Sequence, residues 1–93
     1  MSKNNAVILN PNDNIAVIID DVSKGGLAIV DEQSFEVAST ITFGHKIAIK
    51  PIAKGEHIIK YGVPIGVATA DLEVGQHVHV HNMESLYMKQ FSK

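Results

Sequence analysis

IAKGEHIIKYGVPIGVA, residues 52–68, contains two short apolar segments separated by a Tyr-Gly pair and a proline. Short runs rich in isoleucine and valine and bounded by glycine or proline are typical of strands and turns. The same pattern recurs along the chain, so the sequence predicts a mainly β fold. The predicted strands are Ala6–Leu9, Ile15–Ile19, Ala28–Val30, Ile47–Ile49, His57–Ile59, Ile65–Ala68 and His77–His81.

Two segments are predicted as short helices, Asp31–Ala38 and Met83–Phe91. In the second, apolar side chains recur about once per helical turn. The 93 residues fit one domain, and no linker divides them. We expect a domain over residues 1–82, followed by a tail or short helix over 83–93.

Composition excludes several function classes. The net charge of −2 comes without a dense basic cluster, which argues against nucleic acid as a partner. Cysteine is absent, so disulfides, thiolate metal sites and a cysteine nucleophile are excluded. The apolar run near the start is too short for a signal peptide or a membrane span. We therefore expect a cytoplasmic protein without a membrane partner.

Two internal echoes organise the middle of the chain. An apolar residue, two variable residues and glycine recur as 22–25 (VSKG), 52–55 (IAKG) and 72–75 (LEVG), each before a predicted strand. A helical turn closed by a left-handed glycine explains this motif. The second echo aligns 41–49 with 59–67 and makes Gly44 and Gly62 equivalent. Chance recurrence of short turn patterns is the alternative for the second echo.

The segment 75–82 (GQHVHVHN) is the most unusual stretch of the sequence. In a strand, His77, His79 and His81 share one face, while Val78 and Val80 face the core. Imidazoles in register can bind a divalent metal, donate hydrogen bonds to a carboxylate or carry a proton near neutral pH. A solvated strand face is the alternative.

Two turns carry further candidates. His45 and Lys46 follow Phe43-Gly44 and present an imidazole and an ammonium side by side. Lys60 and Tyr61 precede Gly62 and offer a cation and a phenol. A carboxylate ligand can use both the imidazole of His45 and the ammonium group of Lys46. An exposed strand-end lysine and a half-buried structural tyrosine are the alternatives.

Several ordered blocks resemble one family. Together they are similar to the N-terminal domain of altronate and galactarate dehydratases, a domain of the SAF class with the β-clip fold. The segment 31–36 (DEQSFE) departs from that pattern because it is acidic. The blocks are 9–17 (LNPNDNIAV), 43–48 (FGHKIA), 52–56 (IAKGE), 59–66 (IKYGVPIG) and 75–82 (GQHVHVHN).

The resemblance implies a function in a lyase. In that family the domain is either fused to a large catalytic domain or is a separate small subunit, and the chain end soon after the His-rich segment favours a subunit. The implied reaction removes water from a sugar acid with divalent iron or manganese. A related pair of subunits cleaves sulfolactate. The implied partners are a large catalytic subunit and a small sugar acid, and exposed apolar strands also allow a homo-oligomer.

The resemblance also implies site residues. His79 and His81 would be catalytic and would bind metal or relay protons. Substrate would be contacted by His45, Lys46, Lys60, Tyr61 and Asn82. The alternative functions are a stand-alone SAF-type binding or structural module, the small subunit of a sulfolactate sulfo-lyase, and a self-contained metal-dependent lyase, for which so small a domain offers few ligands and little exclusion of water.

Overall fold

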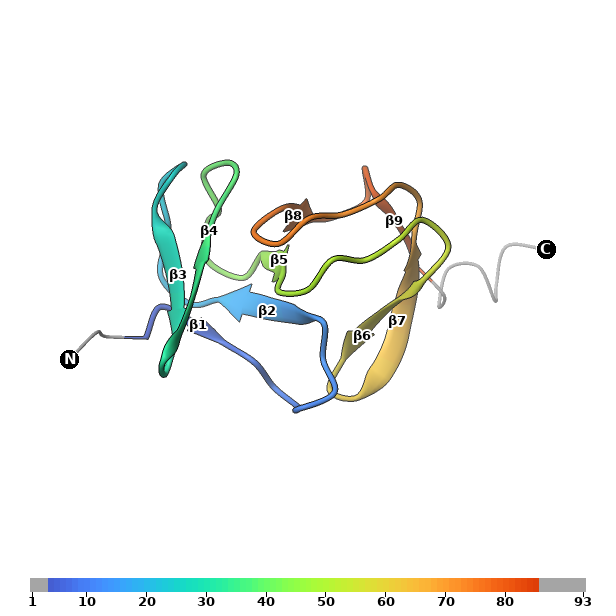
Figure 1. Ribbon diagram of the computed structural model, residues 1–93, viewed down its shortest axis with the longest axis horizontal. Helices are drawn as coiled ribbons and strands as arrows, with labels where there is room; N and C mark the ends of the chain where they lie inside the picture. Colours follow the sequence, from blue (N-terminus) through green and yellow to red (C-terminus); the bar gives the residue numbers. More distant parts are fainter. Residues whose placement is uncertain (1–3, 86–93) are drawn as a thin grey trace.

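The computed structural model describes residues 4–85, and every regular element in that range is a strand (Figure 1). The mainly β class is confirmed, and each predicted strand overlaps an observed one. The strands are β1 (Ala6–Val7), β2 (Ile15–Ile18), β3 (Leu27–Val30), β4 (Gln33–Glu36), β5 (Lys46–Ala48), β6 (His57–Lys60), β7 (Val63–Ala68), β8 (His77–Val78) and β9 (Met83–Ser85).

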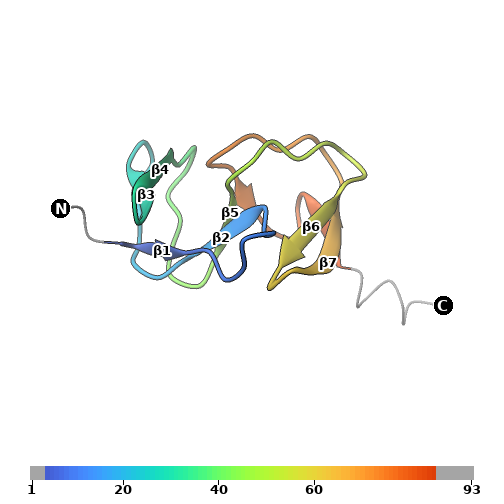
Figure 2. The same cartoon turned by 60° about the horizontal axis from the view of Figure 1, so that its bottom comes forward.

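The strands form three antiparallel sheets. The central sheet has the order β1-β2-β5-β8, and it lies between the β3–β4 hairpin and the β6-β7-β9 sheet in both views (Figures 1 and 2). In the central sheet β5 pairs with β8, so that Lys46 lies opposite Val78 and Ile47 opposite His77. This pairing joins two segments that are far apart in the sequence. No helix in residues 4–85 is long and apolar enough to cross a membrane.

Four β-turns with the same construction precede β3, β5, β6 and β8. In each, the third residue is a glycine with positive φ, which a side chain there would strain: Gly25 (82°), Gly44 (87°), Gly55 (92°) and Gly75 (88°). The first echo is therefore confirmed, but as β-turns rather than helical turns. The second echo is wrong, because Gly44 belongs to this set while Gly62 lies in the β6–β7 hairpin turn.

The β-turns and hairpins make two similar lobes. The first lobe, residues 22–44, contains the β3–β4 hairpin, and the second lobe, residues 52–75, contains the β6–β7 hairpin. Each lobe is closed by an isolated β-bridge between the residues that begin its two turn motifs. The bridges join Val22 to Ile41 and Ile52 to Leu72.

One asparagine holds each hairpin. Asn5 serves the first lobe and Asn14 the second. Each side chain donates from Nδ2 to a carbonyl and accepts at Oδ1 from the N–H two residues later on the first strand of its hairpin. The bonds are Asn5 to Leu27 O (2.9 Å) and Ile29 N (2.6 Å), and Asn14 to His57 O (2.9 Å) and Ile59 N (2.8 Å).

Each lobe packs its own core against the central sheet. Because side chains alternate along β2, Ala16 and Ile18 face one core while Ile15 faces the other. The first core comprises Ala6, Ala16, Ile18, Val22, Ala28, Val30, Val37, Ile41 and Ile47, and the second Ile15, Ala48, Ile52, Ile58, Ala68, Leu72 and Val78.

Both helix predictions need correction. The predicted helix Asp31–Ala38 is wrong, because this segment forms β4 and pairs with β3. Phe35 is partly buried against the first core, and this tertiary contact outweighs the local pattern. The predicted helix Met83–Phe91 is wrong over residues 83–85, which form β9 and pair with β7. Its remaining residues lie outside the described range.

Candidate functional site

Imidazoles from two strands meet where β5 and β8 pair. His45 directly precedes β5, and His77 begins β8 opposite Ile47. The two side chains are in direct contact, with His45 Nδ1 3.0 Å from His77 Nε2. Strand pairing therefore builds this contact between residues from two distant sequence blocks.

His79 and His81 complete a cluster of four imidazoles with His45 and His77. The His79 ring stacks on that of His77 with centroids 5.4 Å apart, and it lies 5.3 Å from the His45 ring. The ring centroids of His81 and His77 are 5.5 Å apart. We call these four residues the imidazole cluster.

The cause of this clustering differs from the predicted one. Strand β8 ends at Val78, and a turn rather than a strand carries His79 and His81. Alternation along one strand therefore does not place all three rings. Val80, predicted to face the core, is 77% exposed.

Asn82 holds the turn together. Its Oδ1 accepts a hydrogen bond from His79 N at 2.9 Å, and its Nδ2 donates to His77 O at 2.7 Å. The side chain is only 3% exposed. Sequence reasoning named Asn82 as a substrate contact, and that role stays a prediction. The two hydrogen bonds show that its side chain holds the backbone of His77 and His79.

Lys46 is the first residue of β5, directly after His45, and pairs with Val78 of β8. Partial burial, with a smaller contribution from Lys60, lowers the pKa of Lys46. The pKa of His77 is also lowered, chiefly by burial and then by His45, His79, His81 and Lys46. Neighbouring positive charges repel one another, so protonation of one imidazole disfavours protonation of the next. A bound anion, or neutral imidazoles, would relieve this repulsion in the imidazole cluster and at Lys46.

Tyr61 lies apart from the rings. It sits at the tip of the β6–β7 hairpin with φ of 60° and is 65% exposed. Within residues 4–85, the imidazoles make ring contacts with one another and not with Tyr61. Of the two residues predicted at this bend, only Lys60 acts electrostatically on Lys46.

Sequence reasoning gave two important residues no role of this kind. His77 was predicted to share a face with His79 and His81 but was left out of the ligand pair, and the β5–β8 register brings it into contact with His45. Asp13 is 1% exposed, and its carboxylate accepts hydrogen bonds from the backbone N–H groups of Tyr61 (3.1 Å) and Gly62 (2.8 Å). The carboxylate thereby fixes the hairpin that carries Lys60.

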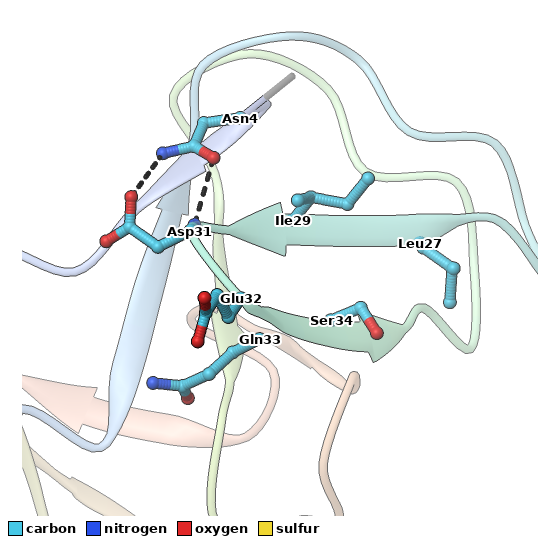
Figure 3. A pocket seen from close by; sticks show the side chains of 7 residues that line it. All are labelled: Asn4, Leu27, Ile29, Asp31, Glu32, Gln33 and Ser34. Atoms are coloured by element: carbon cyan, nitrogen blue, oxygen red, sulfur yellow. Dashed lines mark hydrogen bonds between the residues drawn. The ribbon is translucent and has the colours of Figure 1, made fainter. Parts of the chain in front are cut away.

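A separate hollow of about 540 Å³ lies along the β3–β4 hairpin (Figure 3). Asn4 there donates to Asp31 Oδ1 and accepts from Asp31 N. The predicted acidic segment supplies part of its wall, and no imidazole lines it. The lining residues are Asn4, Leu27, Ile29, Asp31, Glu32, Gln33 and Ser34.

Comparison with known proteins places this chain in a family. The sequence model of the family described as the altronate/galactarate dehydratase SAF domain matches residues 4–86. Altronate dehydratase of Escherichia coli K12 is 47% identical over 70 residues, which cover 75% of this chain and 14% of that protein. Altronate dehydratase of Bacillus subtilis 168 is 39% identical over 77 residues, 83% of this chain and 16% of that protein.

A smaller relative matches over most of its own length. Subunit alpha of (2R)-sulfolactate sulfo-lyase from Chromohalobacter salexigens is 37% identical over 75 residues, 74% of this chain and 80% of that protein. The chain thus spans about a seventh of the altronate dehydratases but most of this lyase subunit. The chain belongs to the altronate/galactarate dehydratase SAF domain family.

Proposed function

We propose that this chain supplies the imidazole cluster and Lys46 to the active site of a hydroxy-acid lyase whose remaining residues come from a larger chain or domain. The observation that carries this proposal is the meeting of four imidazoles at the β5–β8 pair, where Lys46 follows His45 and lies opposite Val78. Clusters of groups that perturb one another's pKa are found preferentially at functional sites.

The proposed chemistry is a β-elimination. A base removes the proton on the carbon next to the carboxylate, and its electron pair forms a carbon–carbon double bond. The β carbon–oxygen bond breaks, and hydroxide leaves as water after it accepts a proton. Negative charge develops on the substrate carboxylate during this reaction, so fixed positive charge lowers the barrier.

The residues have matching roles in this proposal. Lys46 and Lys60 bind the carboxylate or hydroxyls, and His79 and His81 move protons or bind metal. The nitrogen donors fit iron better than manganese, because imidazole suits iron whereas manganese prefers oxygen ligands. Such an ion, when bound, supplies further positive charge for the developing enediolate.

A larger partner is needed because the imidazole cluster lies on the surface. His81 is exposed, and the other three imidazoles are only partly buried. Elimination profits from a site that excludes water, and a domain of this size cannot enclose its substrate. The relatives support a partner or fusion, since one is a lyase subunit and the others are several times longer than the region matched. The expected cytoplasmic location belongs to the same proposal.

The preferred substrate in this proposal is a sugar acid such as altronate, and sulfolactate is the second candidate. Both carry a carboxylate that Lys46 can bind. The names of the relatives support these two acids. An assay of the assembled enzyme with both acids distinguishes the dehydratase from the sulfo-lyase.

The test is turnover by the chain co-purified from its native host with its larger partner. Replacing both His79 and His81 by alanine should lower kcat by about 100-fold or more, as expected for lost acid–base groups. Lys46→Met should raise KM about 10-fold or more through the loss of one charged hydrogen bond. Lys50→Met, which removes an exposed lysine beyond β5, is the matched control.

Two outcomes contradict the proposal. In the first, all variants keep wild-type turnover. In the second, no larger chain co-purifies while the isolated chain binds a small acid tightly, and the chain is then a stand-alone binding module.

A further inference from the structure

Three imidazoles are arranged as one ligand set. His45, His77 and His79 each offer one ring nitrogen, and these nitrogens all lie within 4.8 Å of one another. The shortest separation, 3.0 Å, joins His45 Nδ1 and His77 Nε2. Metal–nitrogen bonds of about 2.0–2.1 Å put two ligand nitrogens about 2.8–3.4 Å apart at cis-octahedral or tetrahedral angles. The His45–His77 pair therefore already has the separation of two ligands on one ion.

The backbone fixes where these ligands start. Pairing of β5 with β8 sets the positions of His45 and His77, and Asn82 holds the turn that carries His79. The nitrogens of all three rings already lie within 4.8 Å of one another, so small movements of the side chains are expected to bring them onto one ion. Within the described part of the chain, the hydrogen bond between His45 and His77 is the one contact that an ion would replace.

We propose that His45, His77 and His79 bind one divalent transition-metal ion in the isolated chain. Three imidazole nitrogens select ions such as zinc, cobalt or nickel over magnesium and calcium, which prefer oxygen ligands. Three protein ligands leave a fourth position open for water or for an oxygen of an acid. This ligand set differs from the pair predicted from the sequence, because it uses His45 and His77 and omits His81.

Lys46 bears on what binds at the open position. It follows His45 in the sequence and pairs with Val78, the residue after His77, so a bound cation adds positive charge close to a lysine. A carboxylate that reaches both the ion and Lys46 relieves that repulsion. The metal-loaded chain should therefore bind a small carboxylate more tightly than the metal-free chain.

The experiment uses the full chain without a partner. Isothermal titration with Zn²⁺ should give one ion per chain, and Co²⁺ should give the intense visible bands of a four-coordinate site. His45→Ala, His77→Ala and His79→Ala should each weaken binding by about 100-fold or more, since losing even an outer-shell partner costs 10–100-fold. The matched control is His57→Ala, which removes the exposed imidazole on β6 outside the cluster.

His81→Ala separates the two ligand sets. The proposal predicts an affinity within about threefold of wild type for this variant, because His81 supplies no ligand atom to the trio. If His81→Ala abolishes binding while His45→Ala does not, the pair predicted from the sequence is correct and the proposal is overturned. Absence of Zn²⁺ binding by the wild type, or an equal loss in His57→Ala, also overturns it.

Two controls keep these outcomes clear. Circular dichroism and thermal unfolding show whether each variant is folded, and His77→Gln replaces His77→Ala if the alanine variant unfolds. Metal binding needs no larger partner, whereas the proposed function is tested by turnover of the complex. Failure of one therefore leaves the other standing.

Discussion

The two lobes have the same construction but are anchored with different strength. In the second lobe the buried carboxylate of Asp13 accepts hydrogen bonds from two successive N–H groups of the hairpin turn. At the same place in the first lobe, the exposed side chain of Asn4 accepts one hydrogen bond from Asp31 N and donates one to Asp31 Oδ1. Because the Asp13 carboxylate is buried and the Asn4 side chain is exposed to water, we expect the hairpin that carries Lys60 to be held more firmly.

The hairpin of the second lobe also has an additional strand along its edge, whereas that of the first lobe has none among the described residues. In the second lobe β9 pairs along β7, and Gly66 permits this because a Cβ there would lie 2.7 Å from Glu84 O and Met83 Cγ. In the first lobe β3 and β4 form a two-stranded sheet. We therefore expect the second lobe, whose hairpin carries Lys60, to be the more stable of the two.

The largest effect is expected at the turn glycines. A Cβ at Gly75 would lie 1.8 Å from the backbone oxygen of Glu36, whereas one at Gly44 would meet nothing within 4 Å, and both residues have positive φ. Gly75→Ala should lower the free energy of unfolding by more than about 4 kcal/mol, and Gly44→Ala by about 1–2 kcal/mol. Urea denaturation measures both, and equal losses would show that the Gly75 contact is unimportant.

The next largest effect is expected at the two side chains that bind the hairpin turns, Asp13 in the second lobe and Asn4 in the first. Asp13→Ala should cost about 2–3 kcal/mol of unfolding free energy, because two N–H groups lose a charged acceptor. Asn4→Ala should cost less than about 1 kcal/mol, since the exposed groups there regain hydrogen bonds from water. Chemical denaturation of the Asp13→Ala and Asn4→Ala variants measures both losses of unfolding free energy. A larger loss for Asn4→Ala would invert the proposed order of the lobes.

The hairpin asparagines should be equivalent. Asn5→Ala and Asn14→Ala each remove one donor and one acceptor bonded to the backbone. We expect each to cost about 2 kcal/mol in a denaturation experiment. Values that differ by more than about 1 kcal/mol would mean that the lobes do not share this anchor as a structural unit.

The smallest effect is expected in the imidazole turn. Val80 is 77% exposed, so Val80→Ser should change the free energy of unfolding by less than about 0.5 kcal/mol. Val78, fully buried in the second core, is the contrast, and Val78→Ala should cost about 2 kcal/mol. A large loss of unfolding free energy for Val80→Ser would mean that Val80 faces the core, as the sequence predicted.

Local patterns were sufficient for much of the fold. Short Ile/Val runs predicted the strand positions, and the glycines in the first echo predicted three turns with positive φ. Strand β4 was missed because its only partly buried apolar residue is Phe35, and its partner β3 decides its conformation. Pairing across the chain is absent from any local window of sequence.

The same limit applies to the candidate site. The cluster at 77–81 was visible because three histidines recur in five residues, and Lys46 was visible beside its glycine turn. The contact between His45 and His77 depends on the β5–β8 register, and the buried position of Asp13 depends on the hairpin above it. The residue types in the sequence indicate the chemistry, but pairing between distant strands determines which of these residues contact one another.

A crystal structure of the chain with Zn²⁺, recorded at the zinc absorption edge, tests most directly whether the imidazole cluster is one site. We predict one strong anomalous peak at about 2.1 Å from a ring nitrogen of each of His45, His77 and His79. A peak bound by His79 and His81 without His45, or a zinc ion held only by His57, would contradict it.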